Sequence, residues 1–318
     1  CLTLAHALTL SDVEQCIFIL KSHQGDFEHY IKEFGYIVEY IPLEFSPDYI
    51  SSDYREWVGG SPSNDALSTL NCLEKHNYEY RDLLVIDHYG LDITFEEILK
   101  KNINNICVID DLVNRKHDCD FLVDQTCGRQ ESEYQHLLPN KAVVLAGEDY
   151  SLLRAEFLCL RATAMLRRKN FTTIKNVFIN FGSTDPTNMT TYIVNLLSKS
   201  SYLNRYNLTV VLGRNSPNVD AVKACLANYS GKVDLVLDAK NMAELIYEAD
   251  VAIGAAGATT WERCALGLPS ILIKTAENQS TVIDRVIGFG VAVLYDIESN
   301  LVELEQKLLH IQSDYKYM

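Results

Sequence analysis

The stretch Asp250–Gly267, DVAIGAAGATTWERCALG, decides the fold of the second half of the chain. Its apolar run 251–253 predicts a buried parallel strand, and a loop of small residues, 254–258, follows that strand. Thr259 or Thr260 is then expected to cap a helix that closes at the end of the stretch. A strand, a glycine loop and a helix start together expose backbone N–H groups that bind anions. The plainer alternative is an ordinary connection between a strand and a helix.

Length and composition restrict the class of protein. The 318 residues suffice for two domains of ordinary size, and 47% of them are apolar, which supports well-formed cores. The formal net charge of −15 disfavours nucleic acid and anionic membranes as partners. The nine cysteines form no CxxC pair, and we interpret them as reduced, buried thiols that form neither a zinc site nor a disulfide framework. No signal peptide or membrane-spanning stretch is visible, and we expect a cytoplasmic protein.

Strand and helix patterns alternate along the whole chain. Strands are expected at 15–20, 36–41, 83–86, 106–111, 121–124, 142–147, 176–181, 208–212, 233–237, 251–253, 270–273 and 291–294. Helices are expected at 26–34, 65–77, 95–101, 189–198, 218–228, 241–248 and 280–288, and a final amphipathic helix follows. Asn64 is expected to cap the second of these helices, and Thr94 is expected to form a capping box with Glu97 on the third. This alternation predicts an α/β fold of two doubly wound, parallel-sheet (Rossmann-like) domains that face each other across a cleft. Ligands are expected beyond the carboxyl ends of the strands.

The predicted domains are an N-terminal domain at residues 1–150, a connecting helix at 151–170 and a C-terminal domain at 171–318. The chain begins with a helical pattern at 1–8, whereas an α/β domain usually opens with a strand. We therefore expect the first strand of the N-terminal domain to be missing from this sequence.

A second candidate anion loop lies in the same half as the first. Residues 180–186, NFGSTDP, follow a predicted strand and precede a helix, so Gly182 permits a close backbone approach and Ser183 offers a hydroxyl. Two such loops in one domain predict ligand binding. A nicotinamide or flavin cofactor is disfavoured, because the full G-x-G-x-x-G pattern and its downstream acidic residue are absent.

The first half carries its polar residues at two strand ends. Asp87, His88 and Tyr89 follow a buried strand and suit acid–base catalysis or substrate orientation. The structural alternative is that Asp87 caps a turn and that Tyr89 packs beneath it. Asp110 and Asp111 also end a strand, and we interpret them as a turn, because no set of ligands at metal-binding spacing completes them.

Several motifs together resemble those of the PseG family, the UDP-2,4-diacetamido-2,4,6-trideoxy-β-L-altropyranose hydrolases of pseudaminic acid synthesis. The motifs are IDHYG (86–90), IDDL (109–112), NR-x-HDCD (114–120), DYSLLR-x-EF (149–157), FGS-x-DP-x-N (181–188), AAGATTWE (255–262) and ENQ (277–279). They occur in order over most of the chain. The PseG family is similar to the MurG glycosyltransferases, so the resemblance implies a two-domain GT-B fold.

The resemblance also implies a site. The C-terminal domain would hold UDP, with Glu262 on the ribose and the segment 238–242 on the uracil. The substrate-binding residues that it implies are Gly182, Ser183, Asp185, Met242, Gly257, Ala258, Thr259, Glu262, Asn278, Gln279 and Arg154. Tyr89, with Asp87 and His88, would present the reacting face of the sugar. Water would attack the anomeric carbon and UDP would leave, with no metal or other cofactor, in a protein expected to be a monomer.

One departure from the family pattern concerns catalysis. The family places a G-x-G-H-x-x-R motif just before the segment that residues 1–5 match, and its histidine is the expected base. Neither His6 nor His23 matches that position, so this chain is expected to lack the main catalytic group. Two alternatives stay open, a MurG-like glycosyltransferase that uses an acceptor in place of water, and a UDP-sugar-binding protein without catalysis.

Overall fold

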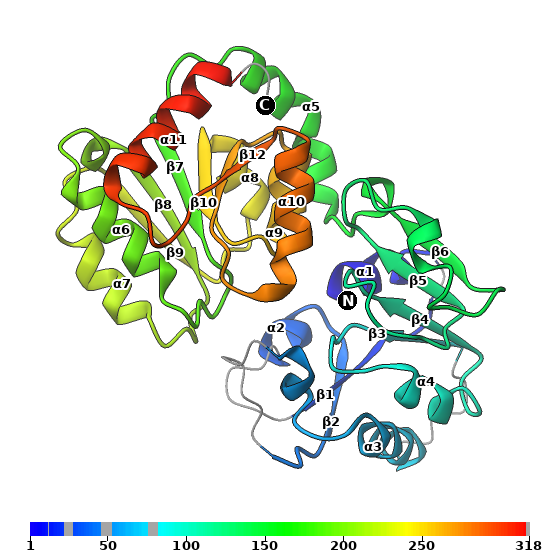
Figure 1. Ribbon diagram of the computed structural model, residues 1–318. Helices are drawn as coiled ribbons and strands as arrows, with labels where there is room; N and C mark the ends of the chain where they lie inside the picture. The colour runs from blue at the N-terminus through cyan, green and yellow to red at the C-terminus, as the bar shows by residue number, and fades with distance from the viewer. Residues whose placement is uncertain (12, 22–27, 46–52, 76–81, 316–318) are drawn as a thin grey trace. The chain divides into compact units, whose positions relative to one another are not determined.

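The computed structural model describes residues 1–11, 13–21, 28–45, 53–75 and 82–315. The chain divides into two compact units, Cys1–Leu152 and Leu153–Met318, here called unit 1 and unit 2 (Figure 1). Every strand pair within these described ranges is parallel. The predicted α/β class with parallel sheets is therefore confirmed. No helix in the described part of the chain is long and apolar enough to span a bilayer.

Unit 2 contains one sheet of six strands. They are β7 (Asn176–Asn180), β8 (Asn207–Leu212), β9 (Val233–Leu237), β10 (Val251–Gly254), β11 (Ser270–Leu272) and β12 (Ala292–Leu294), in the order β12-β11-β10-β7-β8-β9. The chain proceeds from β7 to β8 and β9 on one side, and then returns to β10 on the other side of β7. The strand order thus reverses between β7 and β10, and such a switch point is where open α/β sheets bind ligands.

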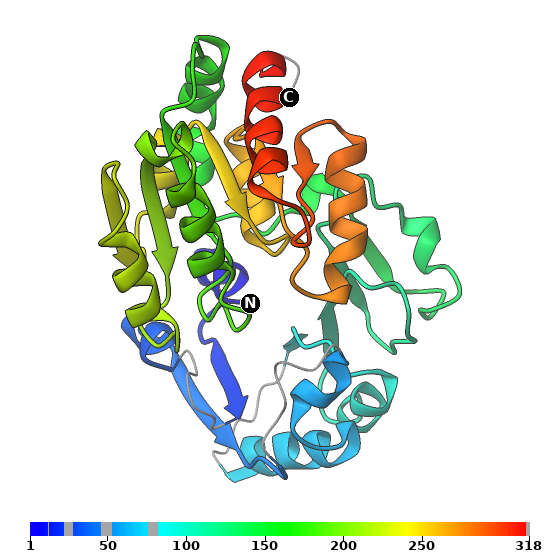
Figure 2. The same cartoon turned by 60° about the vertical axis from the view of Figure 1, so that its left-hand side comes forward.

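Helices cover both faces of this sheet. They are α5 (Ala155–Lys169), α6 (Met189–Lys199), α7 (Val219–Leu226), α8 (Met242–Glu248), α9 (Thr259–Ala265), α10 (Ser280–Gly288) and α11 (Leu301–Asp314). Because side chains alternate along a strand, Val177 and Ile179 of β7 join the core under α6, α7 and α11, while Phe178 joins the core under α5 and α8. Helix α11 lies beside α6 on the same face of the sheet (Figure 2).

Within the described residues, unit 1 contains two separate parallel sheets, one piece of two strands and one piece of four. Its elements are α1 (Leu2–Thr9), β1 (Ile17–Lys21), α2 (Glu28–Glu33), β2 (Ile37–Ile41), α3 (Pro62–Lys75), β3 (Leu83–Ile86), α4 (Ile93–Leu99), β4 (Asn105–Ile109), β5 (Phe121–Asp124) and β6 (Val143–Ala146). Strands β1 and β2 pair with each other, and β3-β4-β5-β6 form the second piece, covered by α3 and α4. Within the described ranges, no strand pairs with the second edge of β1 or the outer edge of β3.

Short 3₁₀ helices complete the architecture at Tyr54–Val58, Glu131–Tyr134, Glu148–Tyr150, Leu203–Arg205 and Glu277–Gln279.

Three helix starts differ from the sequence expectation. Helix α3 begins at Pro62, before the predicted cap Asn64, because the fixed φ of proline suits the first helical turn. Helix α4 is capped by Asp92, whose carboxylate accepts from the Thr94 N–H at 2.9 Å, so the predicted Thr94 capping box is wrong. Helix α5 begins only at Ala155. The ends of two expected helices, positions 26–27 and 76–77, lie outside the described residues.

The end of β10 predicts a sharp difference between two glycine substitutions. A Cβ on Gly254 would lie 2.2 Å from the Asn180 carbonyl oxygen and 2.8 Å from Nη1 of Arg263. Gly254→Ala should therefore lower the free energy of unfolding by about 2 kcal/mol or more, measured by urea denaturation. The control is Gly257→Ala, because nothing lies within 4 Å of its added Cβ, and a change under about 0.5 kcal/mol is expected. Equal effects of the two changes would contradict the packing described here.

Candidate functional site

Asp185 fixes the conformation of the loop after β7 through hydrogen bonds to backbone N–H groups. Gly182 has φ +93° and Asp185 has φ +43°, a conformation that few residues other than glycine adopt. The buried Asp185 carboxylate accepts from the backbone N–H groups of Met189 and Thr190, both at 2.9 Å. Burial raises the pKa of Asp185, and its bonds to Thr190 and Met189 oppose that rise. Asp185 thus occupies the start of α6 and fixes the loop.

The loop after β8 supports this first loop from one side. The Gly213 N–H donates to the Ser183 carbonyl at 2.8 Å, and the Ser216 hydroxyl donates to the Thr184 carbonyl at 2.7 Å. A Cβ on Gly213 would lie only 2.7 Å from the Ser183 carbonyl oxygen. Both carbonyl oxygens are therefore engaged within the protein, while Gly182 and Ser183 remain exposed.

The loop after β10 lies next to the loop after β7. Helix α9 is preceded by Ala258, without a side-chain cap, so the predicted capping by Thr259 or Thr260 is wrong. Both threonines are the first residues of the helix. The Thr259 hydroxyl lies 3.4 Å from Oδ1 of Asn180, the last residue of β7, and joins the two loops. Gly257 and Ala258 are exposed at this edge.

Glu262 is paired with Arg154. Oε1 of Glu262 lies 3.2 Å from Nη2 of Arg154, and the glutamate side chain keeps 20% of its surface exposed. Nη1 of the same arginine lies 3.3 Å from Oε1 of Glu156. Burial raises the pKa of Glu262, and the Arg154 charge opposes that rise. The structure therefore brings the two predicted site residues Arg154 and Glu262 together, with the arginine holding the carboxylate.

Three other residues of the predicted site, Met242, Gln279 and Asn278, lie at the same edge but differ in burial and in hydrogen bonding. Met242 is buried in the core beneath α5, so only its backbone is available to a ligand. The Gln279 side-chain amide exchanges hydrogen bonds with Thr275, at 2.9 Å to the threonine N–H and 2.9 Å to its hydroxyl. Asn278 is partly exposed on the 3₁₀ helix that comes after β11.

The carboxyl edge of β3 carries the predicted catalytic residues of unit 1. Asp87 is exposed. Nδ1 of His88 accepts from the Gly90 N–H at 3.0 Å, and the ring also bonds the Trp57 backbone. Burial lowers the pKa of His88 to about 4. His88 is thus neutral near pH 7 and orients its loop, with no free ring nitrogen to accept a proton.

Tyr89 is bonded to a carboxylate that the sequence analysis assigned to a turn. Its hydroxyl donates to Oδ1 of Asp111 at 2.8 Å. Burial raises the pKa of Asp111 to about 6, and Asp110 and Asp124 add to this rise. The position of Asp111 in the sequence is the feature that indicates this contact. Asp111 follows β4, which pairs with β3, so the carboxyl ends of the two strands lie at one edge of the sheet.

A buried network supports this pair. Arg129 bonds the Asp124 carboxylate and donates from Nη2 to the Asp111 carbonyl at 2.8 Å. The Tyr134 hydroxyl lies within hydrogen-bond distance of Oδ2 of Asp124, at 2.8 Å, and of the Asp110 carbonyl oxygen, at 2.9 Å. No group of three metal-binding side chains occurs among the residues whose structure is described.

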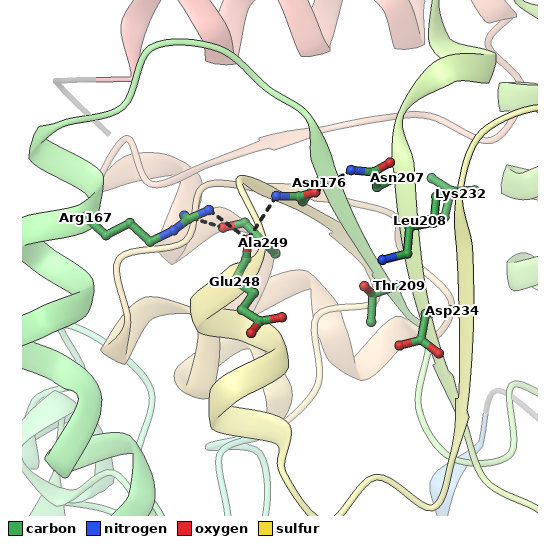
Figure 3. A pocket seen from close by; sticks show the side chains of 9 residues that line it. All are labelled: Arg167, Asn176, Asn207, Leu208, Thr209, Lys232, Asp234, Glu248 and Ala249. Atoms are coloured by element: carbon green, nitrogen blue, oxygen red, sulfur yellow. Dashed lines mark hydrogen bonds between the residues drawn. The ribbon is translucent and has the colours of Figure 1, made fainter.

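A cavity of about 360 Å³ lies at the opposite edge of the unit 2 sheet. It is lined by Arg167, Asn176, Asn207, Leu208, Thr209, Lys232, Asp234, Glu248 and Ala249 (Figure 3). Arg167 already donates to the carbonyl groups of Glu248, at 2.7 Å, and Ala249, at 2.8 Å. The cavity adjoins the amino ends of β7 and β8, whereas ligands of such sheets bind at the carboxyl ends. We therefore place the candidate site at the switch point.

Comparisons with known proteins show which families the chain resembles. Residues 176–315 match the glycosyltransferase family 28 C-terminal domain. Over 234 residues, 73% of this chain and 80% of the other, the chain is 26% identical to the UDP-2,4-diacetamido-2,4,6-trideoxy-beta-L-altropyranose hydrolase of Campylobacter jejuni. Its fold is similar to that of Acinetobacter baumannii MurG, with a TM-score of 0.62 at 13% identity, over 100% of this chain and 87% of that one. The chain is thus similar to the PseG hydrolases in sequence and to MurG-like GT-B proteins in fold.

Two further comparisons define the extent of the likeness. An uncharacterized protein of Methanocaldococcus jannaschii is 29% identical over 292 residues, 89% of this chain and 53% of that protein. The chain thus spans about half the length of this archaeal relative. The glycotransferase of kitacinnamycin has a TM-score of 0.64 at 14% identity, over 99% of this chain and 87% of that one. At such identities, the solved structures show that the GT-B fold is shared.

The raised pKa of Asp111 predicts a pH-dependent effect of removing its charge. A carboxyl whose pKa is about 6 when folded, against about 3.9 when unfolded, destabilises the fold as it ionises between these values. Asp111→Asn keeps an acceptor for Tyr89 and should raise the free energy of unfolding by about 2 kcal/mol at pH 8. The gain should vanish towards pH 4.

Urea denaturation at the two pH values measures this difference. The control is Asp149→Asn, which removes an exposed carboxylate and should change stability by less than about 0.5 kcal/mol at either pH. A loss of stability at pH 8 in Asp111→Asn would show instead that the fold depends on the charge.

Proposed function

We propose that the protein hydrolyses UDP-2,4-diacetamido-2,4,6-trideoxy-β-L-altropyranose to UDP and the free sugar, in the cytoplasm and as a monomer, for pseudaminic acid synthesis. The observation that carries the proposal is the match to the Campylobacter jejuni hydrolase. It extends over 234 residues, which is more than unit 2 contains, so it includes part of unit 1. A shared nucleotide-binding domain alone would not produce this match.

In this proposal, residues 171–318 hold UDP at the switch point of the unit 2 sheet. The exposed backbone at Gly182–Ser183 and Gly257–Thr259 surrounds the diphosphate, because free N–H groups bind anions. Glu262, held by Arg154, accepts hydrogen bonds from the ribose hydroxyls. The segment 238–242 meets the uracil through its backbone, and Asn278 lies towards the diphosphate or the sugar.

The reaction breaks the bond between the anomeric carbon and the β-phosphate oxygen of UDP. A water oxygen forms the new bond to this carbon, and its proton passes to a base. N–H groups around the diphosphate stabilise the charge that remains on UDP. Tyr89, bonded to Asp111, orients the sugar from residues 1–150.

His88 has no free nitrogen, so we assign the base to a histidine in a segment that precedes Cys1. The split sheet of unit 1 supports this assignment. Strand β1 is mostly apolar, yet all five of its residues are only partly buried, whereas a parallel strand inside a sheet is buried on both faces. An additional strand between β1 and β3 would cover it. The loop after that strand would reach the edge at which Asp87 and Tyr89 lie.

A MurG-like glycosyltransferase is the main alternative, favoured by the match to the family 28 C-terminal domain. It would use the same UDP crevice and transfer the sugar to an acceptor. A UDP-sugar-binding protein without catalysis is the second alternative. All three share the UDP site and differ in what happens to the sugar.

The deciding experiment measures UDP release from the UDP-diacetamido sugar in the absence of an acceptor. This chain is compared with a chain that is extended by its natural upstream segment. Release by the extended chain alone is expected, and its loss when the upstream histidine is replaced would locate the base. Binding of UDP without release by either chain would contradict hydrolysis and favour the alternatives.

The Glu262 assignment predicts a specific loss of affinity. Glu262→Ala should weaken UDP binding about tenfold, the effect of one or two lost hydrogen bonds to a charged group, measured by calorimetry. Binding of 2′,3′-dideoxy-UDP should not change. The control is Glu156→Ala, which removes the other carboxylate beside Arg154 and should leave UDP affinity within twofold. Unchanged UDP affinity in Glu262→Ala would refute the ribose contact.

A further inference from the structure

Arg263 places a buried guanidinium beneath the loop after β10. The residue is 1% exposed. Nη2 donates to the Ala255 carbonyl at 2.8 Å and to the Thr260 hydroxyl at 2.9 Å. Nε and Nη1 are also buried, and neither has a hydrogen-bond partner within the part of the chain that the structure describes. The side chain therefore supports the loop with one nitrogen and leaves the donors on the other two unused.

No carboxylate forms a direct ion pair with Arg263 within the described residues. The neighbouring carboxylate, Glu262, forms its ion pair with Arg154 at 3.2 Å. Burial lowers the pKa of Arg263 to about 10, so the guanidinium stays protonated at neutral pH. Buried charges in folded proteins are normally paired or bound to a ligand. An isolated buried cation beside an exposed loop thus requires an explanation.

The position of this cation connects it with the switch point. A Cβ on Gly254 would lie 2.8 Å from Nη1 of Arg263 and 2.2 Å from the Asn180 carbonyl oxygen. The guanidinium therefore reaches the place where the ends of β10 and β7 meet. The loops that continue from these ends expose their backbone at Gly182 and Gly257.

We infer that Arg263 is a positioning residue that gives the candidate site at the switch point its preference for a diphosphate over an uncharged nucleoside. The inference rests on the proposed binding of UDP. Within the protein, the field of a buried cation is screened far less than that of a surface lysine, so it acts on phosphate oxygens through the thin loop. The bond from Nη2 also fixes the Ala255 carbonyl oxygen, which would repel phosphate if it turned towards the ligand. The bound diphosphate in turn supplies the missing counter-charge.

The test compares the affinities for UDP and for uridine, measured by calorimetry or ligand-observed NMR. In Arg263→Gln, which removes the charge, UDP affinity should fall at least tenfold while uridine affinity changes by less than threefold. Arg263→Lys, which keeps a cation, should recover most of the UDP affinity. The control is Arg161→Gln, because exposed Arg161 donates to the Ala265 carbonyl at the other end of α9 and should leave the UDP-to-uridine ratio within twofold.

A purely structural role would give a different result. Equal losses of UDP and uridine affinity in Arg263→Gln, or no recovery in Arg263→Lys, would overturn the inference. If the original chain binds neither UDP nor uridine, the proposed function itself fails. In case the variants do not fold, the Arg263 Nε–H signal of the unaltered chain is followed by NMR. It should shift on addition of UDP and not of uridine, and the absence of a UDP shift would also overturn the inference.

Discussion

The candidate site depends on the close approach of two strand ends, those of β7 and β10. Gly254 leaves no room for a Cβ against the Asn180 carbonyl, and the Ala255 N–H lies 3.4 Å from the same oxygen. This contact sets the spacing of the two loops at the point where the strand order reverses. Arg263 fills the space beneath it. A larger residue at Gly254 would separate the strands and displace both loops of the candidate site.

In unit 1, too, the parallel arrangement of the strands places polar residues close together. Because its strands are parallel, the residues after β3 and β4 meet at one edge, where Tyr89 bonds Asp111. Burial determines the chemistry of this edge, since it keeps His88 neutral and raises the pKa of Asp111 to about 6. In the proposed hydrolysis, a tyrosine that is fixed by a carboxylate orients a sugar hydroxyl, and the water-activating group is assigned to another residue.

The sequence predicted the class of fold and the order of its elements, because apolar strands and glycine loops are local patterns. It failed where side chains compete for the same backbone groups. Asp92, rather than Thr94, caps α4, since both residues can accept the same kind of N–H bond. Asp111 and Arg263 were not recognised as site residues. Their roles depend on burial and on contacts with residues that are distant in the sequence. A pattern of adjacent residues does not indicate such contacts.

The central claim is that UDP binds at the switch point of unit 2, and hydrogen exchange of backbone amides tests it most directly. On addition of UDP, the account predicts slower exchange in two segments, 182–184 and 255–260. No change is expected around the polar cavity at the amino ends of β7 and β8. Slower exchange at that cavity, or no change in either loop at saturating UDP, would contradict the account.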